Sequence, residues 1–478
     1  MIPLLLVLLH AALAGRSSAP PSGPAGSLDD TPSAGSVAPA PAAAPLERRE
    51  ARKTFFVYSR PNASSTRRGM VQRGEAFDVW ERVPGAGCAA GWARLAVDGY
   101  ACLDGSQPTT REPAAFPRPI AFDHPRPAEY ESYARTGKWQ RDVLGPDEGL
   151  VPFIYGKRWR RWQGQFYASA KALERGDPPL DPQPETFHKF RFEELRTSKR
   201  QGELLVRPDG AVVRREEIFL YPVSDFAGRD LLTDPVPVGR IPAWVHGYKG
   251  APLLAAPAAD AEVLQTLPYH TRLELDAAPA DVDGRFWRVP DALGPGQDGY
   301  IDDTRGVRRW SVHPVPSGVG PDDVWVDVDV NQQMLTLFEG WRPVYVTMVS
   351  TGEPGHGTPL GVFRVLDKMA WVDMASRDDA PEEEKYLVEA VPWTIHFEFR
   401  YALHAAYWHW GYGNRASHGC VNLSPRDARA VYERLSPIIP DGWFSIFETA
   451  GDPGSVIRIR AGAEGADRDR RKPPGAKR

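Results

Sequence analysis

The chain has 478 residues, which excludes a single small module and predicts two to four domains. Apolar residues make up 42% and charged residues 25%, close to the globular average, so disorder cannot dominate. Lys and Arg (58) nearly balance Asp and Glu (62), so the net charge of -4 gives no reason to expect a nucleic-acid partner. Pro (47) and Gly (44) exceed their usual share, which favours turns and short strands over long helical bundles.

Residues 1–14 have the pattern of an export signal. Residues 2–13 form an apolar run, and the small residues at its end predict cleavage before Gly15. No Lys or Arg precedes the run, so an uncleaved anchor or a different start is the alternative. Residues 15–50, rich in Ala, Pro, Ser and Gly, are expected to form a disordered tether. We therefore expect an exported protein of the periplasm or cell envelope, with no stable membrane span after signal cleavage.

Short alternating strands separated by Gly-rich turns are expected over residues 51–110. A starting strand, the turn Arg73-Gly74-Glu75, a Gly-Trp-x-x-Leu strand and a closing Gly-Tyr-x-Cys resemble the bacterial SH3-like modules of cell-wall enzymes. The resemblance implies a small β-barrel.

A weak second copy spans residues 241–310. Trp287 corresponds to Trp92, and Gly299-Tyr300 corresponds to Gly99-Tyr100. An unrelated β domain is the alternative reading. Residues 111–240 contain strand-like patches, and no function can be assigned to them from the sequence.

The chain has three cysteines, an odd number for an exported protein. Cys88 and Cys102 lie on two segments that are expected to be adjacent strands, so a disulfide between them is geometrically plausible. Cys420 then remains free. A free thiol in an oxidising compartment is vulnerable unless it is sheltered or used, so Cys420 is either a catalytic candidate or merely a buried cysteine.

The C-terminal third contains a series of predicted strands and one convincing helix. Valines alternate with other residues over 324–330, which predicts a half-buried strand. The helix is expected to begin after Ser424, which can cap it, with Pro425 at its first position and Asp427 completing a capping box.

Residues 401–423 hold three of the eleven histidines together with Cys420. A cysteine thiol with an ordinary pKa of about 8.5 is mostly protonated at neutral pH, so a nucleophilic cysteine needs a nearby base such as imidazole. Gly419 removes side-chain bulk beside the sulfur, and backbone amides near Gly419 and Cys420 could form an oxyanion hole.

Three ordered motifs carry a resemblance to a known family. They are GTPLGVF at 357–363, ALHAAYWHWGYGNRA at 402–416 and SHGCVNL at 417–423. Together they resemble the L,D-transpeptidase catalytic domain, the YkuD family, over residues 322–460. The resemblance implies a mainly β fold: a YkuD-like β-sandwich catalytic domain with one or two short helices, preceded by small SH3-like β-barrels. Residues 461–478 are expected to be a basic, disordered tail.

The resemblance also implies roles for individual residues. Cys420 would be the acylated nucleophile, and His404 the general base, oriented by the backbone carbonyl of Ala405. His418 would line the site and assist. The loop-holding or substrate-binding candidates are Ser417, Gly419, Asn422 and Tyr407, although the aromatic side chains of this segment are equally typical of packing.

One departure concerns the base. His404 lies sixteen residues before Cys420, a shorter separation than in many relatives, and Ala405 stands where glycine is more usual. His409 and His396 are therefore rival bases.

The implied function is that of an exported cysteine L,D-transpeptidase that cross-links peptidoglycan stem peptides and requires no cofactor or metal. L,D-carboxypeptidase action, protein anchoring to the wall and a non-catalytic wall-binding scaffold are the alternatives. A structural zinc site is a minor one, because His404, His409, His418 and Cys420 could supply four ligands. The SH3-like modules could bind wall polymer.

Overall fold

The structure is a computed structural model that describes residues 44–96, 99–120, 122, 149–158, 164–180, 188–311, 313–376, 379–381 and 385–462. These residues form mainly β-strands with two α-helices, α2 (Ala170–Arg175) and α3 (Pro425–Arg434), which agrees with the predicted mainly β fold. The expected signal peptide, most of the tether and nearly all of the basic tail lie outside the described residues. Within the described part, no helix is long and apolar enough to cross a membrane. The described residues from Pro45 onward belong to one compact unit.

The first β-rich segment contains eight short strands. In one sheet β1 pairs with β4 and β8; in the other, β2 pairs with β3 and β7, and β6 pairs with β5 and β7. Val57, Val71 and Phe77 are buried in the core of this segment. The strands are β1 (Glu47–Ala51), β2 (Phe55–Tyr58), β3 (Arg67–Val71), β4 (Ala76–Val79), β5 (Glu81–Val83), β6 (Trp92–Ala96), β7 (Gly99–Cys102) and β8 (Ser106–Pro108).

The second β-rich segment repeats this pairing. β16 pairs with β19 and β22, β17 pairs with β18 and β21, and β20 pairs with β21. Arg288 lies opposite Tyr300 as Arg94 lies opposite Tyr100, in agreement with the weak sequence repeat. The strands are β16 (Arg240–Val245), β17 (Ala251–Leu254), β18 (Val263–Leu267), β19 (Arg272–Asp276), β20 (Phe286–Val289), β21 (Gly299–Asp302) and β22 (Val307–Arg309).

The predicted closed barrels are not found among the described residues. Each segment instead forms two sheets, because its strands pair within one sheet or the other and no ladder joins the two.

Much of the region between the two segments is built into the C-terminal sheets. β10 pairs in parallel with β28, and β15 pairs antiparallel with β25. The sheets of the C-terminal domain therefore include strands that precede residue 322 by more than 90 residues. The strands are β9 (Ile154–Arg158), β10 (His188–Phe192), β11 (Glu194–Ser198), β12 (Gly202–Val206), β13 (Val212–Arg214), β14 (Ile218–Leu220) and β15 (Arg229–Asp230).

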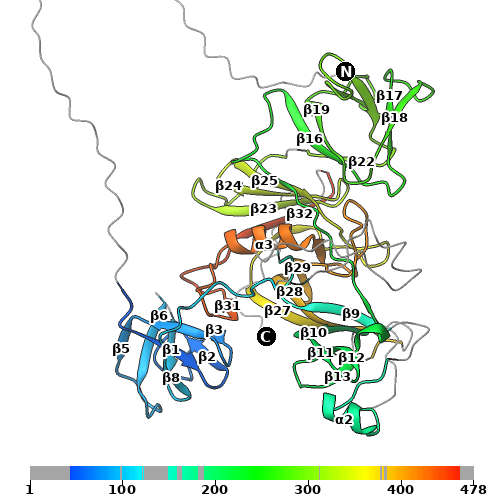
Figure 1. Ribbon diagram of the computed structural model, residues 1–478. Coiled ribbons are helices and arrows are strands. Elements are labelled where there is room, and N and C mark those ends of the chain that lie inside the picture. Colours follow the sequence, from blue (N-terminus) through cyan, green and yellow to red (C-terminus); the bar gives the residue numbers. More distant parts are fainter. Residues whose placement is uncertain are drawn as a thin grey trace, which may run out of the picture. The chain divides into compact units, whose positions relative to one another are not determined.

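The C-terminal domain has two sheets around a shared apolar core. One has the order β15-β25-β24-β23-β32-β26, and the other contains β27, β28, β29 and β30. Helix α3 packs against β28 and β29 (Figure 1), and its side chains Val431 and Tyr432 join the core. The strands are β23 (Val324–Asp329), β24 (Met334–Glu339), β25 (Arg342–Met348), β26 (Gly361–Arg364), β27 (Asp367–Ala375), β28 (Leu387–Glu398), β29 (Tyr401–Ala405), β30 (Val421–Leu423), β31 (Ser445–Phe447) and β32 (Val456–Arg460).

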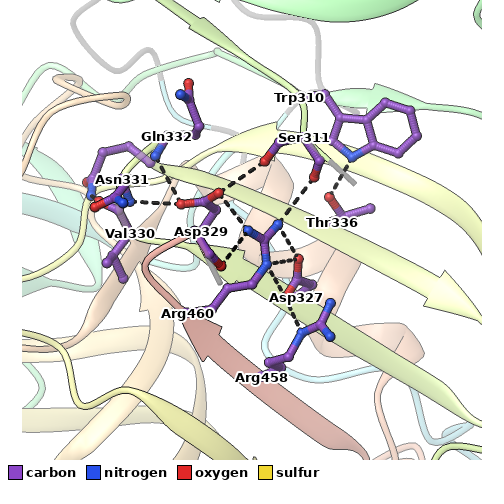
Figure 2. Close-up of polar contacts among 12 residues, drawn as sticks. Trp310, Ser311, Asp327, Asp329, Val330, Asn331, Gln332, Thr336, Arg458 and Arg460 are labelled. Carbon is purple, nitrogen blue, oxygen red and sulfur yellow. Dashed lines mark hydrogen bonds and ion pairs between the residues drawn. The ribbon is translucent and has the colours of Figure 1, made fainter. Parts of the chain in front are cut away.

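A buried ion-pair network joins the first and last strands of this domain (Figure 2). Asp327 on β23 accepts hydrogen bonds from Nε of Arg458 at 2.6 Å and from Nε of Arg460 at 2.9 Å, and these three side chains are at most 3% exposed. Arg460 also bonds Asp329 at 2.8 Å and the carbonyl of Ser311 at 3.2 Å. The network therefore supports the parallel pairing of β23 with β32. Through Ser311 it also holds the chain just after the second β-rich segment.

Candidate active site

The segments that carry His404 and Cys420 meet on neighbouring strands. β29 contains His404, and β30 begins directly after Cys420. The two strands pair in parallel, with His404 opposite Asn422. This register places the sulfur of Cys420 within hydrogen-bonding reach of the backbone amide of Ala402. Strand pairing thus places two residues that lie sixteen apart in the sequence on or beside neighbouring strands, and both line the same cavity.

The imidazole of His404 is buried and oriented by the backbone. Its Nδ1–H donates to the carbonyl of Ala405 at 3.2 Å, which leaves the lone pair of the neutral ring on Nε2. Burial lowers the pKa of His404 to about 4, although the hydrogen bond to Ala405 acts in the opposite direction. His404 is therefore neutral at physiological pH, as a general base must be.

The thiol of Cys420 is partly buried, and its hydrogen-bond acceptor is the carbonyl of Arg400 at 3.8 Å. Burial raises the pKa of Cys420 to about 11, although the hydrogen bond from the Ala402 amide partly offsets this effect. Thiol and imidazole are therefore both neutral in the resting site, rather than a preformed thiolate and imidazolium.

A tight turn presents the sulfur. The Ser417 hydroxyl donates to the carbonyl of Cys420 at 2.6 Å and accepts from the amide of Gly419 at 3.1 Å. Gly419 has φ of 116°, and a Cβ there would lie 2.4 Å from the ring of Tyr401, so only glycine fits. The Gly419 amide is thus engaged within the turn and does not point to an oxyanion in this arrangement. His418 is exposed, with its ring centroid 4.5 Å from that of His356.

A cavity of about 990 Å³ opens beside these groups. Its lining includes the three predicted catalytic residues, His404, His418 and Cys420, together with Ser417 and Asn422. A cavity of this size lies at the upper end of the range for small-molecule sites and has room for a peptide segment.

The two rival bases lie in different surroundings. His409 does not line the cavity, because the Gly411 amide donates to its Nδ1 at 3.2 Å and the Asn422 side-chain amide bonds its Nε2 at 2.9 Å. Burial lowers the pKa of His409 to about 3. His396 does line the cavity, but its Nδ1 lies 2.7 Å from the carboxylate of Asp367. His409 therefore lies outside the cavity, whereas His396 and His404 both line it with Nδ1 held by an oxygen acceptor, so His396 stays a rival of His404.

Comparison with known families identifies this region. Residues 323–459 match the family described as the L,D-transpeptidase catalytic domain, YkuD. The C-terminal part of this chain carries an L,D-transpeptidase catalytic domain.

Related proteins cover the same part of the chain. YciB of Bacillus subtilis, whose name refers it to the L,D-transpeptidases, is 29% identical over 157 residues, which cover 28% of this chain and 76% of YciB. L,D-transpeptidase 1 of Mycobacterium tuberculosis is 32% identical over 158 residues, which cover 30% of this chain and 55% of that protein. The chain thus spans only about half the length of the mycobacterial relative.

Two solved structures are also similar to this chain. The catalytic domain of the Enterococcus faecium L,D-transpeptidase is 20% identical with a TM-score of 0.23, covering 29% of this chain and 98% of that one. An L,D-transpeptidase from Mycobacterium smegmatis is 21% identical with a TM-score of 0.24, covering 45% of this chain and 95% of that one.

The aromatic side chains of the transpeptidase domain divide between cavity and core. Trp408 lines the cavity, whereas Tyr407 is fully buried and stacks on Tyr155 with a centroid distance of 3.6 Å. The Tyr407 hydroxyl donates to the carbonyl of Glu389 at 2.9 Å. Tyr407 therefore packs in the buried core against Tyr155. It does not line the cavity, as it was expected to do.

The remaining candidates are the disulfide and the metal site. Cys88 and Cys102 form a disulfide in the first β-rich segment, with a Cα–Cα distance of 5.6 Å. The four side chains considered for zinc, His404, His409, His418 and Cys420, do not form a ligand cluster among the described residues.

Several residues of the transpeptidase site escaped the sequence reasoning. His356 and Tyr386 line the cavity beside His418, and His356 directly precedes the GTPLGVF motif, so that loop offered a signal. Lys189 also lines the cavity, although it lies in the region to which no function was assigned. No local pattern marks Lys189, because only the pairing of β10 with β28 brings it to the site.

Proposed function

We propose that this chain is an exported cysteine L,D-transpeptidase that cross-links peptidoglycan stem peptides through a thioester on Cys420. The observation that carries the proposal is the pairing of β29 with β30 at the cavity, with the Nδ1 of His404 held by the carbonyl of Ala405. This arrangement leaves Nε2 of His404 to accept the proton of the Cys420 thiol. Both residues lie within 323–459, the range that matches the L,D-transpeptidase catalytic domain, YkuD.

In the proposed mechanism, Nε2 of His404 accepts the thiol proton as the sulfur of Cys420 attacks the carbonyl carbon at the L-centre of a donor stem. The bond from that carbon to the terminal D-Ala nitrogen then breaks, and the imidazolium returns its proton to the leaving amine. The amine of a second stem attacks the thioester and loses a proton to His404, and the Cys420 thiolate leaves and is reprotonated. The product is a cross-link between an L-centre and a D-centre.

The pKa values determine the timing of the first proton transfer. The pKa of Cys420 is raised to about 11 and the pKa of His404 is lowered to about 4, both chiefly by burial. Because burial disfavours both charged forms, complete transfer of the proton before substrate arrives is unfavourable. The proton is therefore expected to move as the sulfur–carbon bond forms, when the charge passes to the substrate oxygen.

An oxyanion donor is part of the same proposal. Of the two amides considered, that of Cys420 is the candidate, because the amide of Gly419 donates to Ser417 in the resting turn. His418 and Asn422, which line the cavity, would contact the stem peptide or hold the loop.

The alternative outcomes use the same residues. Water in place of the second amine gives L,D-carboxypeptidase trimming, and a protein lysine in that place gives anchoring to the wall. A wall-binding scaffold would leave Cys420 unacylated.

We also propose that the two β-rich segments are SH3-like modules that bind wall polymer. Their repeated strand pairing and the Gly-Tyr strands at equivalent places support this assignment. An extracytoplasmic site of action follows from the export signal and from the proposed substrate.

Mass spectrometry of disaccharide-tetrapeptides incubated with the protein lacking residues 1–14 tests the proposal, with Cys420→Ala as the control. Cross-linked dimers made only by the wild type would support transpeptidation, and tripeptides alone would favour carboxypeptidase action. Intact substrate with both proteins, together with no mass shift on exposure to a carbapenem, would refute the enzyme proposal. Cys420→Ala that still binds isolated sacculi would then favour the scaffold.

A further inference from the structure

The catalytic cavity contains a lysine from outside the residues that match the transpeptidase family. Lys189 lies on β10, whereas the family match begins at residue 323. β10 pairs in parallel with β28, and Lys189 lies opposite Val388, which lines the same cavity. Phe190 and Phe192 pack into a separate core, so the alternation of the strand directs Lys189 away from that core.

The strand that carries Lys189 is firmly anchored to β28. Glu389 accepts hydrogen bonds from His188 at 2.7 Å, from the Arg191 amide at 2.9 Å and from Arg207 at 2.9 Å. Burial alone would raise the pKa of Glu389, but the hydrogen bonds from His188, Arg207 and the Arg191 amide outweigh it and lower the pKa to about 2. The ionised Glu389 carboxylate is therefore fully engaged in these hydrogen bonds. It holds the strand that carries Lys189 in place, as a binding residue requires.

Among the described residues that line the cavity, cationic side chains outnumber carboxylates. Lys189, Lys385 and Arg400 line the cavity against one described carboxylate, Asp373, which accepts from the Ala390 amide at 2.8 Å. Among the described residues, Lys189 makes no ion pair within 4.0 Å with a carboxylate. Its Nζ instead lies 5.5 Å from the ring centroid of Trp408, the same ring that lies 5.7 Å from that of His404.

We propose that Lys189 forms a carboxylate-binding subsite in the catalytic cavity and selects stem peptides that carry a free carboxylate. This inference rests on the proposed function, because it assigns part of the substrate to a particular side chain. The partly desolvated ammonium gains a charge-assisted hydrogen bond when a carboxylate enters. The subsite adjoins the proposed base, because the Trp408 ring lies 5.5 Å from the Lys189 ammonium and 5.7 Å from the His404 ring.

The protonation state of Lys189 is compatible with this role. Burial lowers the pKa of Lys189 to about 8, with a smaller contribution from Lys157. The side chain is therefore mainly cationic at neutral pH, with about ten protonated molecules for each neutral one.

The carboxylate has two sources, the terminal residue that leaves the donor and the residue that carries the acceptor amine. One arm of the test compares donors that end in a carboxylate or a primary amide, with the acceptor fixed. The second arm compares acceptors with a carboxylate or an amide beside the attacking amine, with the donor fixed. The arm that depends on Lys189 identifies which carboxylate it binds.

The variants are Lys189→Met, which removes the charge at similar length, and Lys189→Arg, which keeps the charge. Lys157→Met is the matched control, since Lys157 is a neighbouring cation that lines a different cavity. We expect Lys189→Met to raise KM for the carboxylate substrate about ten- to hundred-fold with a smaller effect on kcat, and to leave the amide substrate nearly unchanged. Lys189→Arg should retain most of the preference, and Lys157→Met should behave as wild type.

Equal use of carboxylate and amide substrates by the wild type, or a full preference retained by Lys189→Met in both arms, would overturn the subsite. If the wild type forms no product, the proposed function fails separately. Calorimetric binding of the carboxylate and amide peptides to Cys420→Ala, with and without Lys189→Met, then tests the subsite without turnover. Tighter binding of the carboxylate peptide that disappears in Lys189→Met supports the subsite. An unchanged preference in Lys189→Met, or no preference in either protein, refutes it.

Discussion

The resting protonation state of Cys420 leads to a quantitative prediction for thiol alkylation. With the pKa raised to about 11 by burial, roughly 0.1% of the thiol is ionised at pH 8, whereas a reference thiol with a pKa of 9.0 would be about 10% ionised. The higher pKa makes the thiolate roughly ten-fold more nucleophilic, given a Brønsted coefficient of 0.4–0.5. The net expectation is that iodoacetamide alkylates Cys420 about ten-fold more slowly at pH 8 than a free model thiol.

The pH profile is the sharper measurement. The alkylation rate, followed by intact-protein mass spectrometry, should rise about ten-fold per pH unit from pH 7 to 10, because the thiolate fraction does so below the pKa. Cys420→Ala controls for labelling elsewhere, since Cys88 and Cys102 are paired in a disulfide.

His404→Ala separates this resting state from a preformed ion pair. Alkylation at pH 8 should change little, because neutral His404 does not stabilise a resting thiolate, whereas acylation by a carbapenem should fall by about 10²- to 10⁴-fold with loss of the general base. A plateau of alkylation below pH 7 that disappears in His404→Ala would refute the reasoning and would reveal a thiolate–imidazolium pair.

Three further predictions concern the surrounding structure. Glu389→Gln should lower the free energy of unfolding by about 3 kcal/mol at pH 7. Because the pKa of Glu389 is depressed in the folded protein, the stability advantage of the wild type is complete above about pH 4.5 and is lost as the pH falls towards 2. Equal denaturation of the two proteins at pH 7 would contradict this. Asp327→Asn should cost about 3–5 kcal/mol, since buried Arg458 loses its carboxylate partner while Arg460 keeps its pairing with Asp329, and a thermal midpoint within about 1 °C of the wild type would argue against it. Reduction of the Cys88–Cys102 disulfide, which closes a separation of 14 residues, should lower the free energy of unfolding by up to about 3 kcal/mol in chemical denaturation. Carbapenem acylation should not change. A parallel loss of acylation would show that the first β-rich segment supports the site.

The local features of the transpeptidase domain were readable from the sequence. The alternating valines predicted the strand now seen as β23, although both of its faces are buried and the expected half-buried strand was wrong in that respect. Ser424 caps α3 by accepting from the Asp427 amide at 3.1 Å, with Pro425 at its start. The motif around Cys420 also singled out His404 and Cys420, which line one cavity, and their catalytic roles stay a prediction. The strand and the helix cap depend on side chains within a few residues of one another, so periodicity and spacing reveal them, whereas the roles of His404 and Cys420 came from the family resemblance.

Only the tertiary structure decided which distant segments complete the site. Lys189 reaches the cavity through a strand pairing across about 200 residues, and Tyr407 enters the core because Tyr155 stacks on it from a region without a recognised motif. His409 turns away from the cavity because Asn422 and Gly411 bond both ring nitrogens. Each outcome depends on contacts between chain segments that the folded sheets alone bring together, and hydrophobic periodicity within one segment carries no information about its partner.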